Sequence, residues 1–109
     1  MQKEIESYIE YIKSDYRSWQ KVGDEIAGVN PIRQQMIAEF NQKIEVLEGS
    51  KFAKIVVKNS AHSFIVLKAF DKFKVGDILK AASWKAPAKN FARGNILEAN
   101  YGSISWAGA

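Results

Sequence analysis

The sequence predicts an α+β fold, in which an N-terminal two-helix hairpin packs with a small, mostly antiparallel β-sheet. Two observations favour this class: apolar residues recur at helical spacing up to Gly49, and beyond Gly49 they follow the alternation of strands. A chain of 109 residues has the length of one domain. We therefore expect one domain over residues 1–109, with a helical hairpin over 1–49 and a basic, β-rich half over 50–109.

Two helices account for the first half of the chain. The first is expected from about residue 3 to residue 21, ending at Gly23, and its apolar face consists of Ile5, Tyr8, Ile9, Ile12, Tyr16 and Trp19. Asn30 and Pro31 are typical of a helix start, since Asn caps free amides and Pro fits the first turn. The second helix is expected to end at Gly49, with a buried face of Met36, Ile37, Phe40, Ile44 and Leu47.

Strands are expected in the second half, where β-favouring residues alternate between turn signals. Two antiparallel strands over 51–59 and 62–70 are predicted to be separated by Ser60 and Ala61, and a third to follow a turn at Gly76 and Asp77. Residues 84–94 indicate a loop. The fourth and fifth candidate strands are residues 95–100 and 103–109.

The charges are distributed unevenly along the chain. Residues 1–50 carry 6 basic and 9 acidic side chains, whereas residues 51–109 carry 10 basic and 3 acidic ones, a net charge of +7. The second half is therefore expected to attract a polyanion or a phosphorylated small molecule. The chain has no cysteine, which excludes disulfides and thiolate metal sites. Without a signal-peptide pattern or an apolar stretch of about 18 residues, we expect a cytoplasmic protein that does not enter membranes.

Residues 80–95 form the most unusual segment, the basic loop. Four cations, two aromatic residues and a proline occur in these sixteen residues without any carboxylate: Lys80, Lys85, Lys89, Arg93, Trp84, Phe91 and Pro87. Aromatic faces stack on bases and cations bind phosphates, while Asn90 and Asn95 carry amides suited to base or ribose edges. The alternative is that Trp84 and Phe91 anchor a core and the lysines form a solvated rim.

Other candidate residues carry weaker signals. Arg33 stands in the first turn of the second helix, where it either helps free amides to hold an anion or pairs with a nearby acid. His62 is the only histidine and is expected to be a turn or edge residue, and Asp77 a turn residue. No P-loop, GxSxG motif or carboxylate pair is present. We therefore expect neither an enzyme nor a cofactor.

The second half resembles a family of small proteins encoded by tailed bacteriophages and prophages. The resemblance rests on HSFIVLKAF and on the tract GDILKAASWKAPAKNFARGN, with NPIRQQMIAEF as a looser match in the first half. In outline the chain is also similar to the family of Thoeris anti-defence protein 1. That similarity implies an oligomer that sequesters a cyclic ADP-ribose signal without cleaving it, with the ligand enclosed between protomers.

Three functions follow as expectations. The first is a phage anti-defence protein, a dimer or a higher homo-oligomer such as a hexamer, that captures a cyclic nucleotide in the host cytoplasm. Its expected ligand-binding residues are Arg33, Trp84, Lys85, Lys89, Asn90, Phe91, Arg93 and Asn95. The second is a nucleic-acid-binding accessory protein that uses the same loop. The third is a protein in which the loop is a protein–protein patch. The aromatic stripe of the first helix either faces the core or pairs in part with a second copy.

Overall fold

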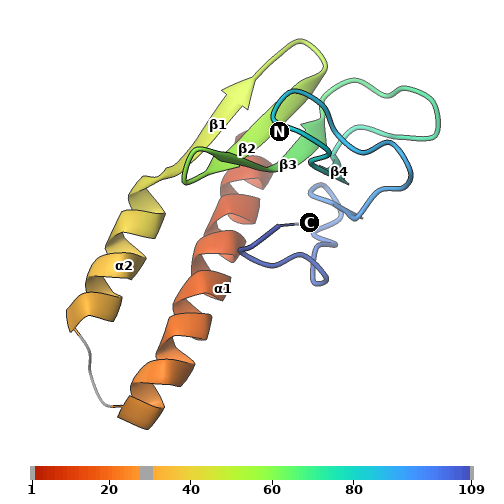
Figure 1. Cartoon of the computed structure of the whole chain (residues 1–109). Helices are drawn as coiled ribbons and strands as arrows, with labels where there is room; N and C mark the ends of the chain where they lie inside the picture. The colour runs from red at the N-terminus through yellow and green to blue at the C-terminus, as the bar shows by residue number, and fades with distance from the viewer. Residues whose placement is uncertain (1, 28–30, 109) are drawn as a thin grey trace.

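The computed structural model describes residues 2–27 and 31–108, without the side chains of residues 19–27, 31–34 and 37. Two helices precede five strands: α1 (Gln2–Ala27), α2 (Pro31–Gln42), β1 (Ile44–Glu48), β2 (Phe52–Val57), β3 (Ser60–Val66), β4 (Asp77–Lys80) and β5 (Gly94–Asn95). The strands form one sheet in the order β1-β2-β3-β4-β5, and every pair of neighbours is antiparallel. The predicted α+β class, with helices packed on a small antiparallel sheet, is confirmed (Figure 1).

The first helix is longer than predicted. It continues through Gly23 to Ala27, because a single glycine inside a helix costs only about 1 kcal/mol and the residues after it continue the helical pattern. The ends of α1 and α2 project beyond the sheet (Figure 1), which gives the molecule its elongated shape of 49 × 25 × 23 Å.

The second helix begins at Pro31, as predicted, but it ends at Gln42 and not at Gly49. The amide of Lys43 donates to the carbonyls of Glu39 and Phe40, which closes the last turn. Ile44 and Leu47, predicted on the helix, lie in β1 and pair with Val57 and Lys54 of β2. Their spacing fits a helix, but the segment alternates as well, and pairing with β2 decides between the two. Met36 and Leu47, both predicted to be buried, are exposed, whereas Phe40 is buried.

The turn between β2 and β3 consists of Lys58 and Asn59, so the predicted separation at Ser60 and Ala61 is wrong. Lys58 and Asn59 have φ angles of 51° and 66°, as a two-residue hairpin turn of type I′ requires. Asn adopts this left-handed backbone more readily than other residues with a side chain. Ser60 and Ala61 belong to β3 and pair with Val57 and Val56.

This turn gives a first testable prediction. Asn59→Val is expected to lower the free energy of unfolding by about 1 to 2 kcal/mol, because a β-branched residue is strained at positive φ. Asn59→Gly, the matched control, should change it by less than about 0.5 kcal/mol. Urea unfolding followed by circular dichroism measures both, and equal stabilities of the two variants would contradict the assigned turn.

The last third of the chain forms less regular structure than predicted. The turn at Gly76, whose φ angle is 91°, and the strand after it are confirmed. Of the predicted fourth strand, residues 95–100, only Asn95 lies in a strand, because the segment folds back and Asn95 pairs with Asn100. Over residues 103–108 the structure has turns and an isolated bridge between Ser105 and Gly108 in place of the predicted fifth strand.

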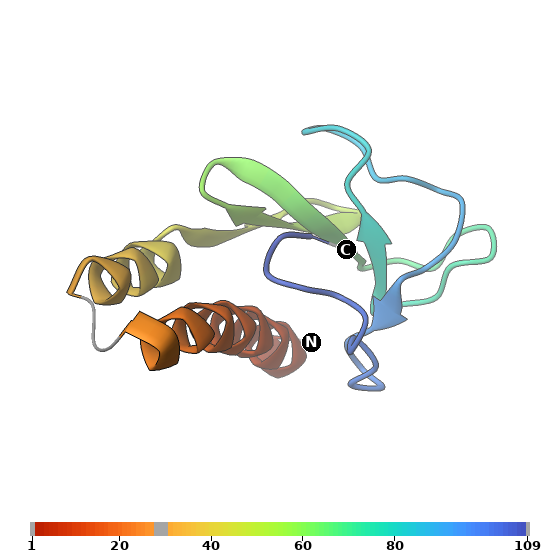
Figure 2. The same cartoon turned by 60° about the horizontal axis from the view of Figure 1, so that its bottom comes forward.

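The main core lies between α1, the sheet and the C-terminal segment, which runs beside α1 on the same side of the sheet (Figure 2). Of the five described residues of the helix stripe, Ile5, Tyr8, Ile12 and Tyr16 are buried in it, and Ile9 is partly buried against it. Tyr16 stacks on Phe40 of α2 with 3.9 Å between the ring centroids. The core-facing interpretation of the stripe is therefore confirmed for these residues, while the side chain of Trp19 lies outside the described part.

A second, smaller cluster lies on the opposite face of the sheet. Its buried members are Phe64, Val66, Phe73 and Leu79. Phe52 and Phe70 pack against them, with their ring centroids 5.6 Å apart and nearly perpendicular. The segments that connect β3 with β4 and β4 with β5 lie over this cluster, since Phe70 and Ala92 both contact it. The basic loop is thus attached to the sheet by an aromatic layer of its own.

Candidate functional site

The basic loop is held in a defined conformation by backbone hydrogen bonds. The amide of Ala88 donates to the carbonyl of Lys80 at 2.7 Å, and that of Arg93 to the carbonyl of Ile78 at 2.7 Å. Between these anchors Ser83 and Ala86 close a tight turn, because the amide of Ser83 donates to the carbonyl of Ala86 and the amide of Ala86 donates to Ser83 Oγ. This turn places Trp84 and Lys85 at the tip of the loop, where both are exposed.

Trp84 is 45% exposed and one of its faces is covered by a cation. Lys54 Nζ, from the middle of β2, lies 4.0 Å from the centroid of the Trp84 ring and 5.8 Å from that of Phe64. A cation against one face of an indole leaves the exposed remainder of the ring for a second planar group. The pair therefore combines a stacking surface and a positive charge at one place.

Phe91 and Arg93 form a second pair of the same kind. The guanidinium carbon of Arg93 lies 3.9 Å from the ring centroid of Phe91, which is 53% exposed. Arg93 Nε is buried and has no hydrogen-bond partner among the described residues. A guanidinium stacked on an exposed ring can recognise phosphates and base edges through its terminal NH2 groups.

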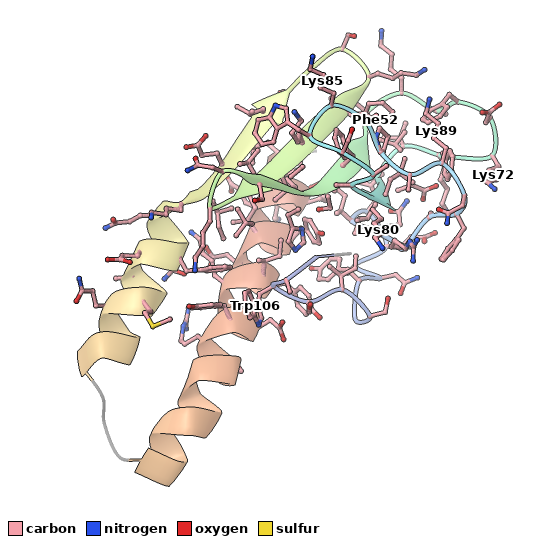
Figure 3. All side chains as sticks on the ribbon, viewed as in Figure 1. Phe52, Lys72, Lys80, Lys85, Lys89 and Trp106 are labelled. Atoms are coloured by element: carbon pink, nitrogen blue, oxygen red, sulfur yellow. The ribbon has the colours of Figure 1, made fainter. Side chains whose placement is uncertain are left out.

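Lysines surround the aromatic cluster between the two loops. Lys51 Nζ and Lys89 Nζ lie 4.5 Å and 5.9 Å from the centroid of Phe70. Lys72 Nζ donates to the carbonyl of Asn90, and this hydrogen bond joins the β3–β4 connection to the basic loop. Figure 3 shows Lys72, Lys85 and Lys89 on this side of the sheet, together with Phe52. We refer to Lys51, Lys54, Phe70, Lys72, Trp84 and Lys89 as the basic aromatic face.

A cavity of about 360 Å³ opens on this face, lined by Asp71, Lys72, Phe73 and Lys89. Two lysines and one carboxylate give its lining a net positive charge, and Phe73 forms an apolar wall. The cavity has the size of a small-molecule site but little enclosure, since Asp71, Lys72 and Lys89 are all exposed.

Asn95, predicted to contact a ligand, instead holds the structure together. Its side chain is 3% exposed and donates to Asp77 Oδ1 at 2.9 Å and to the carbonyl of Val75 at 3.2 Å. Its oxygen accepts the amides of Leu97 and Glu98. Asp77 accepts the amide of Lys74 as well, which confirms its predicted role as a turn residue. With its polar atoms bonded internally, Asn95 positions the end of the loop and does not face a ligand.

Of the other predicted site residues, four are exposed on the loop, and the fifth, Arg33, has its side chain outside the described part of the chain. Lys85, Lys89, Asn90 and Phe91 are exposed on the loop with Trp84. Asn90 Oδ1 accepts the amide of Phe91 at 2.9 Å, so this oxygen is already used. The side chain of Arg33 lies outside the described residues. Sequence analysis missed Lys51, Lys54 and Lys72, because each is 18 or more residues away along the chain from the group that it meets, namely Phe70, Trp84 and the carbonyl of Asn90.

His62 is neither a turn nor an exposed edge residue, contrary to the prediction. It is buried, its Nε2 donates to the carbonyl of Ser105 at 2.8 Å, and its Nδ1 lies 2.9 Å from Ser63 Oγ. Ser63 Oγ lies 2.9 Å from the hydroxyl of the buried Tyr8. Since a carbonyl only accepts, Nε2 carries the proton, and the chain runs from Tyr8 through Ser63 to Nδ1 of a neutral imidazole. Burial lowers the pKa of His62, against the opposing effect of its bond to Ser105.

The neutral imidazole predicts how stability depends on pH. Because the pKa of His62 is lower in the folded than in the unfolded chain, protonation favours unfolding: stability is full above about pH 6.5 and falls as the pH decreases, by up to about 1.4 kcal/mol per pH unit. Urea midpoints between pH 7.5 and pH 5 measure the fall. His62→Gln removes the only histidine, so its stability should vary much less over this range. Parallel curves for both proteins would contradict the assignment.

Charge and membrane features complete the description of the site. Lys74 and Glu98 form an exposed ion pair at 2.8 Å, and the hydrogen bond that Lys74 donates to Glu98 raises the pKa of Lys74. Over residues 2–27 and 31–108, no group of three or more histidines and carboxylates is placed to hold a metal ion. Within the same residues, neither helix is long and apolar enough to cross a membrane.

Comparison with known proteins places the chain in a family. It belongs to a family of unknown function, DUF7717, whose model matches residues 1–109. No curated protein and no solved structure matches the chain. The family extends over both the helical hairpin and the basic sheet, so these two parts are features of one family fold.

Proposed function

We propose that this protein is a non-catalytic binding protein for nucleotides, which it holds by stacking bases on aromatic rings and by pairing phosphates with lysine and arginine. The observation that carries the proposal is the pair of half-exposed rings, Trp84 and Phe91, each with a cation against one face at about 4 Å. Stacking of one base on an aromatic side chain contributes about 1 to 3 kcal/mol.

A single-stranded nucleic acid is the ligand that the geometry favours. The aromatic rings and lysines are spread over an open surface and not gathered in an enclosed pocket, and this suits a strand that contacts several cations in succession. The net charge of +7 over residues 51–109 supports the same choice.

Sequestration of a cyclic nucleotide signal is the second candidate. The cavity lined by Lys72, Phe73 and Lys89 supports it, because its 360 Å³ and positive lining suit a compact phosphorylated ligand. This cavity is open on one side, so tight capture requires a second protomer to cover it. In this form the protein is a phage-encoded homo-oligomer that acts against immune signalling in the cytoplasm of the bacterial host.

One pair of assays tests the proposal. The affinity for a labelled oligothymidylate of about 12 nucleotides is measured by fluorescence anisotropy over a series of salt concentrations. In parallel, the protein is mixed with cyclic ADP-ribose isomers, washed and heat-denatured, and released compounds are identified by mass spectrometry. Binding that weakens steeply with salt supports a nucleic-acid partner, and intact release of one isomer supports sequestration. If neither ligand binds, the proposal is wrong and the loop is better explained as a protein–protein patch.

A further inference from the structure

Two cavities adjoin each other at the start of β3, away from the tip of the basic loop. One, of about 240 Å³, is lined by Phe40, Lys58, Trp106 and neighbouring residues, and the other, of about 350 Å³, by Lys80, Ser105 and neighbouring residues. Both are also lined by Ala61, His62 and Ala107. They therefore form one continuous groove between the β2–β3 hairpin and the C-terminal segment, which we call the His62 groove.

Local irregularity of the sheet creates this groove. Ile55 pairs with Ser63 and Val56 with Ala61, so His62 is an extra residue in β3, a β-bulge. β4 ends at Lys80, opposite Ser63, whereas β3 extends three residues further back to Ser60. The C-terminal segment crosses this uncovered part of β3, where the carbonyl of Ser105 accepts the hydrogen bond from His62. Bulges often re-aim a side chain next to a functional site.

The two ends of the groove differ in chemistry. At one end the rings of Phe40 and Trp106 meet at 86°, with centroids 6.0 Å apart, and Lys58 Nζ lies 5.7 Å from the centroid of Phe40. At the other end the lining is more polar and includes the exposed Lys80. Among the described residues, neither Lys58 nor Lys80 has a carboxylate within ion-pair distance. An aromatic end and a cationic end lie on either side of His62.

We propose that the His62 groove binds a nucleoside monophosphate, with the base against the partly exposed ring of Trp106, beside Lys58, and the phosphate at Lys80. The aromatic walls suit a flat heterocycle, and Lys58 is placed to donate to an acceptor atom of its edge. The groove is separate from the basic aromatic face, since none of the residues that define that face lines it.

The test uses the full chain and the probes AMP, UMP, adenosine and inorganic phosphate, with binding followed by two-dimensional NMR. On AMP addition, the indole N–H signal of Trp106 and the amides of His62 and Ala107 are expected to shift, while the indole signal of Trp84 stays in place. Trp84→Phe and Trp106→Phe assign these two signals among the three indoles of the chain. Adenosine and phosphate alone should bind at least about tenfold more weakly than AMP, because each fills only one end.

Two variants locate the site. Ala61→Trp fills the groove without removing a hydrogen-bonding group and should abolish the AMP shifts, and Lys80→Glu should weaken AMP binding about tenfold. Lys68→Glu, the charge reversal of another exposed lysine, outside the groove, is the control and should bind as the parent does. Thermal melts verify that each variant is folded. The proposal is overturned if neither AMP nor UMP binds, if Trp84 shifts in place of Trp106, or if Ala61→Trp binds AMP normally while folded.

Discussion

Gly94→Ala is expected to destabilise the protein by about 3 kcal/mol or more, the largest stability effect of a single methyl group that the structure predicts. A Cβ atom at this position would lie 2.0 Å from the carbonyl oxygen of Asn100 and 3.3 Å from the Cα of Tyr101. Both are backbone atoms, which cannot rotate away as the end of a side chain can. The change must displace the segment in which Asn95 and Asn100 exchange hydrogen bonds at 2.8 Å and 2.9 Å.

Gly102→Ala provides the matched control, because no atom lies within 4 Å of the added Cβ. Its free energy of unfolding should remain within about 0.5 kcal/mol of the parent value. Both variants are compared by urea unfolding at pH 7.5, above the range in which His62 titrates. Similar losses in the two variants would show that β5 and the turn after it do not pack as described.

The helical part of the fold follows from the sequence because its signals are local. The spacing of Tyr8, Ile12 and Tyr16 defines a buried face without reference to the rest of the chain, and these three residues are buried. The segment from Ile44 to Glu48 is different, since its apolar residues fit both a helix and a strand. Pairing with β2 decides between them, and no local pattern contains that information.

The candidate site, like the fold, could be predicted from the sequence only where its signals are local. Trp84 and Phe91 interrupt a polar loop, and that local anomaly correctly indicates exposed aromatic residues. Asn95 was expected beside them on a ligand, but its partner Asp77 is 18 residues away and is reached only through the antiparallel pairing of β4 with β5. The burial of His62 likewise depends on Ser105, 43 residues further along the chain. Contacts between residues so far apart in the sequence are set by tertiary structure.

The double variant Trp84→Ala/Phe91→Ala is expected to lower the affinity for single-stranded DNA about 100-fold. Each ring contributes about 1 to 3 kcal/mol of base stacking, so the two rings together contribute about 2 to 6 kcal/mol, a range that includes the 2.8 kcal/mol or so that corresponds to this factor. Both rings are about half exposed and neither belongs to the buried core, so the fold should survive. Fluorescence anisotropy with the labelled oligothymidylate measures the affinity, and Met36→Ala, an exposed apolar residue on α2, is the control.

The salt dependence of binding separates the contribution of the aromatic rings from that of the cations. Removing rings should leave the slope of log affinity against log salt unchanged, because no phosphate contact is lost. Lys54→Gln and Lys89→Gln should each reduce the slope by about 0.7, the value for one phosphate contact on a single strand. Lys54 is the more informative position, since its ammonium also lies on Trp84. A slope that falls in the double aromatic variant as much as in the lysine variants would mean that the rings only position the cations, and base stacking would then have no part in binding.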